Sequence, residues 1–206
     1  MERSILIATQ NKHKRIKLAN IVRGFFEKID FPETVGLTLD ARESGNTFKE
    51  NAAEKARTLS ETYEGYVIAT DGGMSIPALG DKWNKLRTRR FAGENATDLD
   101  RIKSLLKLME GLEGKDRLML WTEALAIAKD GKLLFIKEVE GARGIATKTF
   151  SKQCYAEGIW MCSVWYFPQF KKNYFELNKV EKLTAEVSWN KLKTFTRGFL
   201  KKGAGH

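Results

Sequence analysis

Short apolar runs alternate along the chain with stretches in which apolar residues recur every three or four positions. Residues 5–8, Ile-Leu-Ile-Ala, form such a run, and apolar side chains then return at helical spacing between residues 14 and 26. A short run is typical of a buried strand, and the longer spacing is typical of an amphipathic helix. The opening of the chain therefore predicts a strand, a polar loop at residues 9–11 and a helix.

The same alternation continues toward the middle of the chain. A second helix is predicted over about residues 47–63, because Asn46 or Thr47 can cap it and Ala, Lys and Glu dominate its interior. Residues 66–69, Tyr-Val-Ile-Ala, then predict a buried strand, and the Asp-Gly-Gly sequence at residues 71–73 predicts a turn after it.

Farther on, the pattern predicts a helix over residues 99–110 and two long strands over residues 118–128 and 133–139. Lys-Asp-Gly-Lys at residues 129–132 separates these strands, and Asp-Gly between two such runs favours a two-residue hairpin turn. We therefore expect an α/β fold whose sheet is at least partly antiparallel. The tail, residues 191–206, is predicted to be helical or partly disordered.

Composition agrees with a packed globule. Hydrophobic residues make up 42% and charged residues 30% of the 206 residues, and no repeat, low-complexity segment or Pro-rich linker divides them. We predict a single domain over residues 1–206. No stretch approaches the roughly 18 uncharged apolar residues of a membrane span, and the N-terminal run is too short for a signal peptide, so we expect a cytoplasmic protein.

The formal charge of +10 favours polyanions such as nucleotides or nucleic acids. Because the basic residues are spread along the whole chain, solubility alone accounts for this charge equally well. The two cysteines, Cys154 and Cys162, predict neither a disulfide framework nor a metal-thiolate site.

Polar side chains cluster where the first predicted strand meets its helix. Thr9, Asn11 and Lys14 surround this turn. A helix N-terminus offers backbone N–H groups and a positive dipole end, and Lys14 adds a full charge. These residues predict a phosphate site, and the alternative interpretation is an ordinary solvated helix cap.

Two carboxylates complete the candidate chemistry. Glu50 stands at the start of the second helix and Asp71 follows a buried strand. Carboxylates beside phosphate can hold a hard divalent cation such as Mg²⁺, and one of them can orient or deprotonate an attacking water. Taken singly, Glu50 is also a residue that the helix dipole favours, and Asp71 is also a turn former. The combination with the phosphate cluster carries the prediction.

The order of several motifs resembles the HAM1-like inosine triphosphate pyrophosphatase family. The first ten residues from Ile5, I-L-I-A-T-Q-N-K-H-K, resemble its opening motif, and T-F-K-E-N-A from Thr47 resembles its T-F-x-E-N-A. A-T-D-G-G from Ala69 stands where the family has A-D-D-S-G. Further matches are R-F-A-G-E at 90–94, G-A-R-G at 141–144, Y-F-E-L at 174–177 and E-K at 181–182. Several spaced motifs in one order are far more specific than one of them.

This resemblance implies an elongated mixed β-sheet flanked by helices, with two lobes around a central cleft. It also implies a homodimer, dependence on Mg²⁺, and hydrolysis of a nucleoside triphosphate to the monophosphate and pyrophosphate. It makes Asp71 the base or water-orienting carboxylate and Glu50 a magnesium ligand, with Asp71 also close to the metal. The residues that it implies on the substrate are Thr9, Asn11, Lys14, Gly72 and Lys182, and it makes Arg90 a candidate for either a phosphate contact or a structural contact.

The resemblance fails at the family's base-recognition motif G-F-G-[YW]-D-P, which falls on G-I-W-M-C-S at residues 158–163. Ile159 replaces the stacking aromatic residue and Cys162 replaces the acidic residue, whereas Trp160 offers a replacement ring. These changes predict an altered base preference, because a pocket discriminates strongly through the polar groups that it pairs.

Two further departures accompany this one. The family's S-H-R falls on Ser188, Trp189 and Asn190, and Thr70 replaces the first carboxylate of A-D-D-S-G. The sequence therefore predicts a nucleoside triphosphate pyrophosphatase with a rebuilt base pocket. The alternative is a nonhydrolytic nucleotide- or RNA-binding protein on the same fold, which the charge and the aromatic stretch from Trp160 to Phe167 would serve.

Overall fold

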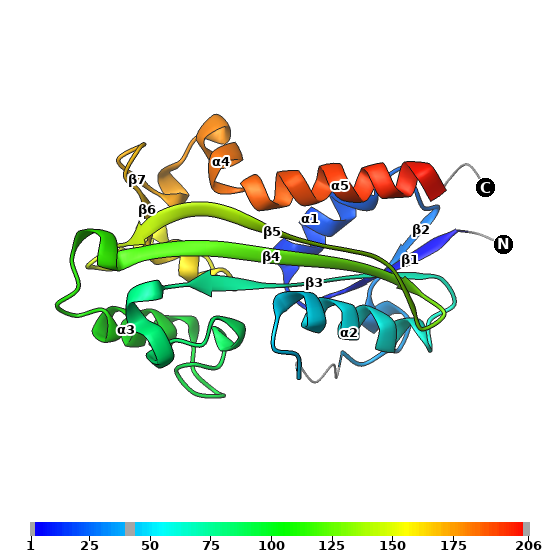
Figure 1. Ribbon diagram of the computed structural model, residues 1–206, viewed down its shortest axis with the longest axis horizontal. Helices are drawn as coiled ribbons and strands as arrows, with labels where there is room; N and C mark the ends of the chain where they lie inside the picture. Colours follow the sequence, from blue (N-terminus) through cyan, green and yellow to red (C-terminus); the bar gives the residue numbers. More distant parts are fainter. Residues whose placement is uncertain (1–2, 40–43, 204–206) are drawn as a thin grey trace. The chain divides into compact units, whose positions relative to one another are not determined.

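The computed structural model describes residues 3–39 and 44–203, and within them seven strands form one sheet in the order β2-β1-β3-β4-β5-β6-β7 (Figure 1). The strands are β1 (Ser4–Ala8), β2 (Lys28–Asp30), β3 (Tyr66–Ser75), β4 (Leu118–Lys129), β5 (Lys132–Ala146), β6 (Trp165–Phe167) and β7 (Lys172–Asn173). The α-helices are α1 (Lys12–Val22), α2 (Phe48–Ser60), α3 (Asp98–Leu108), α4 (Lys179–Ala185) and α5 (Val187–Gly203).

The sheet is mixed, which confirms the predicted α/β class. Strand β1 pairs in parallel with both β2 and β3, with Ile5 opposite Ile29 and Ile7 opposite Ile68. Strand β6 pairs antiparallel with both β5 and β7. None of the described helices is both long and apolar enough to cross a bilayer.

The chain divides into two compact units, and the single-domain prediction stays a prediction. Unit 1 contains the residues up to Gly72, Glu123–Val139 and the residues from Trp189 onward. Unit 2 contains Gly73–Thr122 and Glu140–Ser188.

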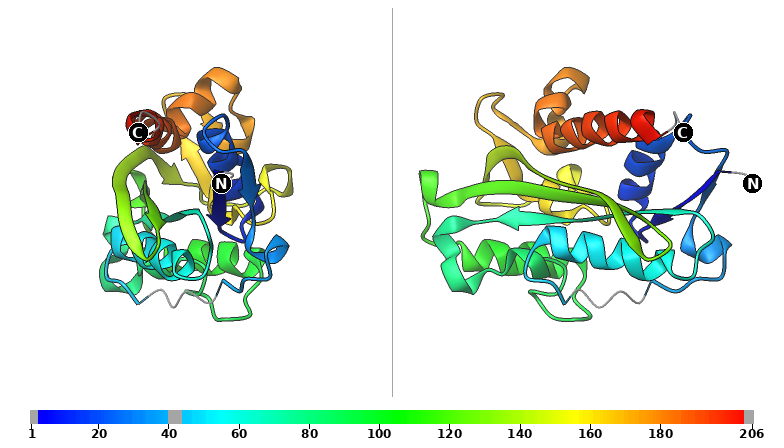
Figure 2. Two further views of the ribbon diagram at one scale, coloured as in Figure 1. Left: turned by 90° about the vertical axis from the view of Figure 1, so that its right-hand side faces the viewer. Right: turned by 45° about the vertical axis from the view of Figure 1, so that its right-hand side comes forward.

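In unit 1, α2 covers one face of the strands and α1 and α5 cover the other (Figures 1 and 2). The α1 and α5 face is closed by alternate strand residues packed against apolar helix residues, as the period of two in a strand requires. The fully or almost fully buried members of this cluster, which we call the α1/α5 cluster, include Ile5, Ile7, Leu18, Ile21, Ile68, Leu125, Ile127, Leu192 and Leu200. The predicted helical tail is thus confirmed to Gly203, and His206 lies outside the described residues.

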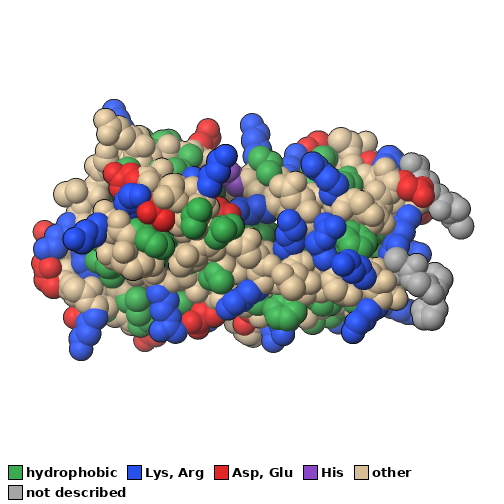
Figure 3. Space-filling model, turned by 90° about the horizontal axis from the view of Figure 1, so that it is seen from above, with side chains coloured by type: hydrophobic (Ala, Val, Ile, Leu, Met, Phe, Trp, Pro, Cys, Tyr) green, Lys and Arg blue, Asp and Glu red, His purple; other side chains and the backbone are tan. Residues whose placement is uncertain are grey.

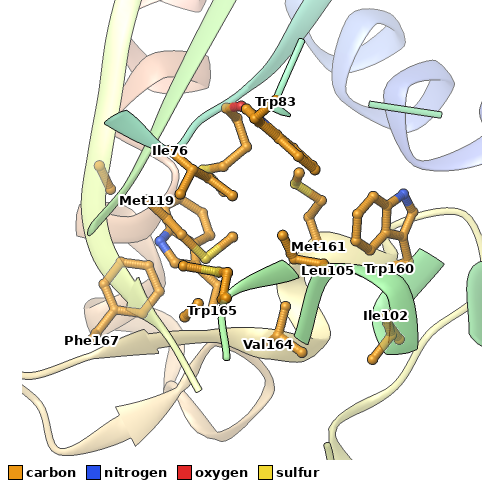
Figure 4. Packing of buried hydrophobic residues seen from close by; sticks show 14 of the residues in the cluster. Ile76, Trp83, Ile102, Leu105, Met119, Trp160, Met161, Val164, Trp165 and Phe167 are labelled. Atoms are coloured by element: carbon orange, nitrogen blue, oxygen red, sulfur yellow. The ribbon is translucent and has the colours of Figure 1, made fainter. Parts of the chain in front are cut away.

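Unit 2 has its own apolar core, drawn in Figure 4, where side chains from α3, β4, β6 and the loops point toward one another. Met119 and Phe167 are completely buried, and the indole Nε1 of Trp83 donates to the Met74 carbonyl at 2.6 Å. The aromatic stretch from Trp160 to Phe167 contributes to this core, since Trp160, Trp165 and Phe167 are each less than a tenth exposed.

The predicted turn at Asp71-Gly72-Gly73 is wrong. Strand β3 runs through these residues to Ser75, so Asp71 lies within a buried strand and does not follow it. A glycine pair permits a turn but does not require one, and neighbouring strands supply the hydrogen bonds that keep the segment extended.

The predicted hairpin between β4 and β5 is confirmed. Asp130 and Gly131 connect the strands with φ of 50° and 70°. Positive φ at both central residues is the geometry that matches the twist of a hairpin, and Asp-Gly supplies it at low cost.

We predict that Arg117→Met lowers the free energy of unfolding by about 3–5 kcal/mol, measured by urea denaturation, because it leaves buried carbonyls without a donor. Burial lowers the pKa of this guanidinium, which donates to four carbonyl oxygens at 2.6–3.2 Å. The control is Arg143→Met, which removes an exposed ion pair with Glu140 and should change stability by less than about 0.5 kcal/mol. Equal effects of the two variants would contradict the prediction.

Candidate active site

The candidate residues of unit 1 lie near the carboxyl end of β1. Thr9, Asn11 and Lys14 follow this strand, and Asp71 lies in β3 two residues beyond Ala69, which is opposite Ala8. Helix α1 leads from β1 to the neighbouring strand β2, whereas β3 lies on the other side of β1. Connections that diverge from adjacent parallel strands leave a crevice at their carboxyl ends, and open α/β sheets bind ligands there. The N-termini of both α1 and α2 are at this edge (Figure 1).

The loop after β1 is a helix cap. Asn11 Oδ1 accepts hydrogen bonds from the backbone N–H groups of His13 at 2.9 Å and Lys14 at 3.2 Å. The Asn11 N–H in turn donates to Thr9 Oγ1 at 3.2 Å. The capping interpretation is therefore confirmed. Two backbone N–H groups of the first turn already donate to Asn11. Attraction of a phosphate to this helix end therefore depends on the helix dipole and on the Lys14 ammonium.

The start of α2 is tied to Asp71 by one buried side chain. Asn51, only 2% exposed, accepts from the Gly45 N–H at 2.9 Å and donates through Nδ2 to Asp71 Oδ2 at 2.9 Å. A Cβ on Gly45 would lie 2.6 Å from Glu50 Cβ and 2.7 Å from Asn51 Oδ1, so the loop comes this close only because residue 45 is glycine.

Glu50 precedes Asn51 and is exposed at the helix start. Its N–H donates to the N-cap Thr47 at 3.1 Å, and its Oε2 accepts from the Asn46 N–H at 2.6 Å. Carboxylates at this position are favoured by the helix dipole. The fold thus holds Glu50 next in the chain to Asn51, the residue that contacts Asp71.

This donor set suits a hard cation that keeps part of its water shell. Among the described residues, no group of three or more His, Cys, Asp and Glu could enclose a metal ion. Mg²⁺ is usually held by one or two carboxylates together with water and substrate phosphates. Glu50 and Asp71 fit that requirement.

The predicted base-side residues are divided between the two units. Trp189 and Asn190 stand in the first turns of α5 in unit 1, where the Lys17 ammonium lies 5.6 Å from the Trp189 ring. In unit 2, Trp160 stacks on Phe91 at 5.7 Å and is 7% exposed. Ile159 and Cys162, at the start of the same short helical segment, are partly exposed.

The two predicted phosphate cations of unit 2 lie in different settings. Arg90 is exposed, 3.7 Å from Glu94. The Lys182 ammonium lies 5.6 Å from the ring of Tyr174, whose hydroxyl donates to Glu186 at 2.7 Å. Burial, followed by Cys162 and Glu186, raises the pKa of Tyr174 far above its ordinary value, so this hydroxyl stays protonated.

The comparisons with known proteins identify the family. A model of the Ham1 family matches residues 5–186. The chain belongs to the Ham1 family. It is 39% identical over 128 residues to the dITP/XTP pyrophosphatase of Thermoanaerobacter pseudethanolicus, an alignment that covers 62% of this chain and 64% of that relative. It is 32% identical to the dITP/XTP pyrophosphatase of Geobacillus kaustophilus, with 87% and 86% of the two chains covered.

The fold of this Ham1 family member agrees with solved structures. A HAM1 protein from Coxiella burnetii has a TM-score of 0.78 at 24% identity, and the match covers 95% of this chain and 99% of that one. The Staphylococcus aureus Ham1 protein has a TM-score of 0.75 at the same identity. At this identity the likeness establishes the fold alone.

Two charged residues of this Ham1 family chain escaped the sequence analysis. The first is Lys55, whose ammonium lies 3.5 Å from the carbonyl oxygen of Thr70, next to Asp71. The second is Glu123, whose Oε1 accepts a hydrogen bond from Lys14 Nζ at 2.8 Å. Lys55 stands one turn after Asn51, a spacing that puts both on one side of the helix. Glu123 could have been noticed as the lone carboxylate in the apolar run 118–128.

We predict that Asn11→Ala lowers the free energy of unfolding by about 1 kcal/mol, because the cap of α1 is lost. Asn11→Ser should cost close to nothing, since a hydroxyl caps equally well. Thermal unfolding of the three proteins checks both expectations. A loss of stability in Asn11→Ser equal to that in Asn11→Ala would contradict the capping role.

Proposed function

We propose that this chain is a Mg²⁺-dependent hydrolase that converts a nucleoside triphosphate to the monophosphate and pyrophosphate. The single observation that carries the proposal is the buried Asn51–Asp71 contact at 2.9 Å, which holds a carboxylate of β3 close to where β1 ends. Membership in a family whose relatives are named dITP/XTP pyrophosphatases supports the same reaction.

Water attacks the α-phosphorus in this proposal. The new P–O bond forms as the bond to the β-phosphate oxygen breaks, and pyrophosphate leaves. Asp71 orients the water and accepts its proton, while Asn51 holds the carboxylate in place. Glu50 and Asp71 would hold a Mg²⁺ ion, which would supply positive charge to the phosphate oxygens.

Cations position the phosphates, because this chemistry asks the protein mainly for orientation and charge stabilisation. Lys14 and the N-terminal end of α1 face the phosphates from one strand end, and Lys55 lies beside the backbone that carries Asp71. Thr9, Asn11, Gly72, Arg90 and Lys182 complete the proposed substrate contacts.

The base preference is proposed to differ from that of the dITP/XTP relatives. Ile159, Cys162, Trp189 and Asn190 do not provide the polar pattern of the motifs that they replace. The indole of Trp160 is packed against Phe91, which covers one face of the ring that was expected to replace the stacking residue. A pocket with fewer fixed polar partners discriminates less between bases.

A nonhydrolytic RNA-binding protein is the second candidate. The burial of Trp165 and Phe167 weighs against an aromatic stacking platform. Lys and Arg side chains are dispersed, with Asp and Glu among them, over the face drawn in Figure 3. These observations favour hydrolysis. The homodimer and the cytoplasmic location stay predictions.

The first test is a panel of ribo- and deoxyribonucleoside triphosphates with Mg²⁺, with monophosphate and pyrophosphate quantified separately. We expect both products in equal amounts and no activity after EDTA. The ratio of kcat/KM for ITP to that for ATP should stay below about 10², because the base contacts are reduced. Release of orthophosphate in place of pyrophosphate, or no turnover of any triphosphate, would refute the proposed reaction.

The second test is Asp71→Asn, which should lower kcat by a factor of about 10² to 10⁴ because the carboxylate that accepts the proton is lost. The matched control is Asp130→Asn in the β4–β5 turn, where asparagine tolerates the positive φ and activity should be retained. Full activity in Asp71→Asn would remove Asp71 from the mechanism.

A further inference from the structure

A completely buried carboxylate lies on β4, in the same row of side chains as two members of the α1/α5 cluster. Glu123 lies on β4 and is 0% exposed. Leu125 and Ile127 follow it at alternate positions and belong to the cluster, so Glu123 occupies a place in a row of apolar side chains on the same face of the sheet.

Stability does not account for this glutamate. Its partner is the Lys14 ammonium at 2.8 Å, whose side chain is 20% exposed. Removing a carboxylate from water costs several kcal/mol, and apolar replacements of buried ion pairs are often neutral or stabilising. A leucine would continue the row at no such cost. The glutamate therefore has a role beyond filling the core, and its partner is the lysine at the start of α1.

A second observation concerns the neighbouring strand. Thr70 stands where the motif A-D-D-S-G has its first carboxylate. It is two residues after Ile68 on β3, so both side chains lie on the face of the sheet that carries the α1/α5 cluster. Thr70 is 2% exposed, and among the described residues its hydroxyl has no hydrogen-bond partner. Strands β3 and β4 are neighbours in the sheet. One carboxylate is thus absent from β3 and one is present on β4, on the same face.

We infer that Glu123 is a positioning residue that holds the Lys14 ammonium at the phosphate site, in place of the carboxylate missing at Thr70. The inference rests on the proposed function. An ammonium has three N–H donors, so a bond to Glu123 is compatible with bonds to phosphate oxygens. The buried carboxylate restricts the rotamers of the Lys14 side chain before the ligand binds. The conformational entropy of this side chain is then not lost on binding, and affinity is higher.

The experiment compares Glu123→Leu, Glu123→Gln and the double variant Thr70→Asp/Glu123→Leu with wild type. Two quantities are measured: the Kd of Mg²⁺-tripolyphosphate by calorimetry, and kcat and KM for the best nucleotide of the panel. The control is Glu113→Gln, which breaks a Glu–Lys pair at 2.6 Å on the exposed surface.

In Glu123→Leu we expect Kd and KM to rise about tenfold, the change that corresponds to ordering one long side chain, with kcat altered less than about twofold. The melting temperature should fall, because Lys14 loses its carboxylate, but the fall is limited because the Lys14 side chain is 20% exposed and its ammonium can turn to water. Glu123→Gln, which keeps the shape and an acceptor, should show a smaller rise. The double variant should regain most of the lost affinity, and the control should not change.

Unchanged or lower Kd and KM in Glu123→Leu would overturn the inference, and so would a double variant that binds no better than the single one. If Glu123→Leu does not fold, Glu123→Gln becomes the test, and its Kd for Mg²⁺-tripolyphosphate must rise for the inference to hold. Because tripolyphosphate binding needs no turnover, a wild type that binds it but cleaves no nucleotide refutes only the proposed function. A wild type that cleaves nucleotides but does not bind tripolyphosphate retains the proposed function, and the inference is then overturned unless KM rises in Glu123→Leu.

Discussion

A carboxylate inside a buried strand has to be met by a hydrogen-bond donor, and the candidate site depends on this constraint. Asp71 lies within β3, and the Asn51 amide reaches it from α2. The same amide accepts from the Gly45 backbone, so the loop before α2, the helix start and the strand are joined through one side chain. Loss of that amide would remove one hydrogen bond from the buried Asp71 carboxylate and one from the partly buried Gly45 N–H, which is costly in a low-dielectric interior.

In unit 1, acidic candidate residues lie on one face of the sheet and a basic candidate residue lies on the other. The α2 face presents Asp71 and, at the helix start, Glu50. The α1/α5 face presents Lys14, backed by the buried Glu123. Under the proposed function, a chelated triphosphate would contact charges of both signs near the carboxyl end of β1.

Unit 2 contributes a different kind of constraint. Its core is rich in aromatic residues, and Trp160, in the segment that resembles a base-recognition motif, is packed within it (Figure 4). A side chain that fills a core is held by the volume around it and is poorly placed to adapt to a ligand. The departure from the family's motif at Trp160 is therefore tied to the packing of unit 2.

Much of this protein follows from its sequence alone. The longer strands and helices, the Asp-Gly hairpin and the Asn11 cap depend on residues close together in the chain, so the local pattern is sufficient to predict them. The short elements β2, β6, β7 and α4 were not predicted, because they are too short to show a period. The motif order likewise led to the Ham1 family and to Asp71 and Glu50 as candidates.

Only the tertiary structure decided that Gly72 and Gly73 continue β3, that Asn51 bonds to Asp71 and that Glu123 bonds to Lys14. A glycine pair takes its conformation from strands that pair with it, and an ion pair between residues 109 positions apart leaves no periodic signal in either segment. Local chemistry determined which residues could act, and long-range packing determined which of them meet.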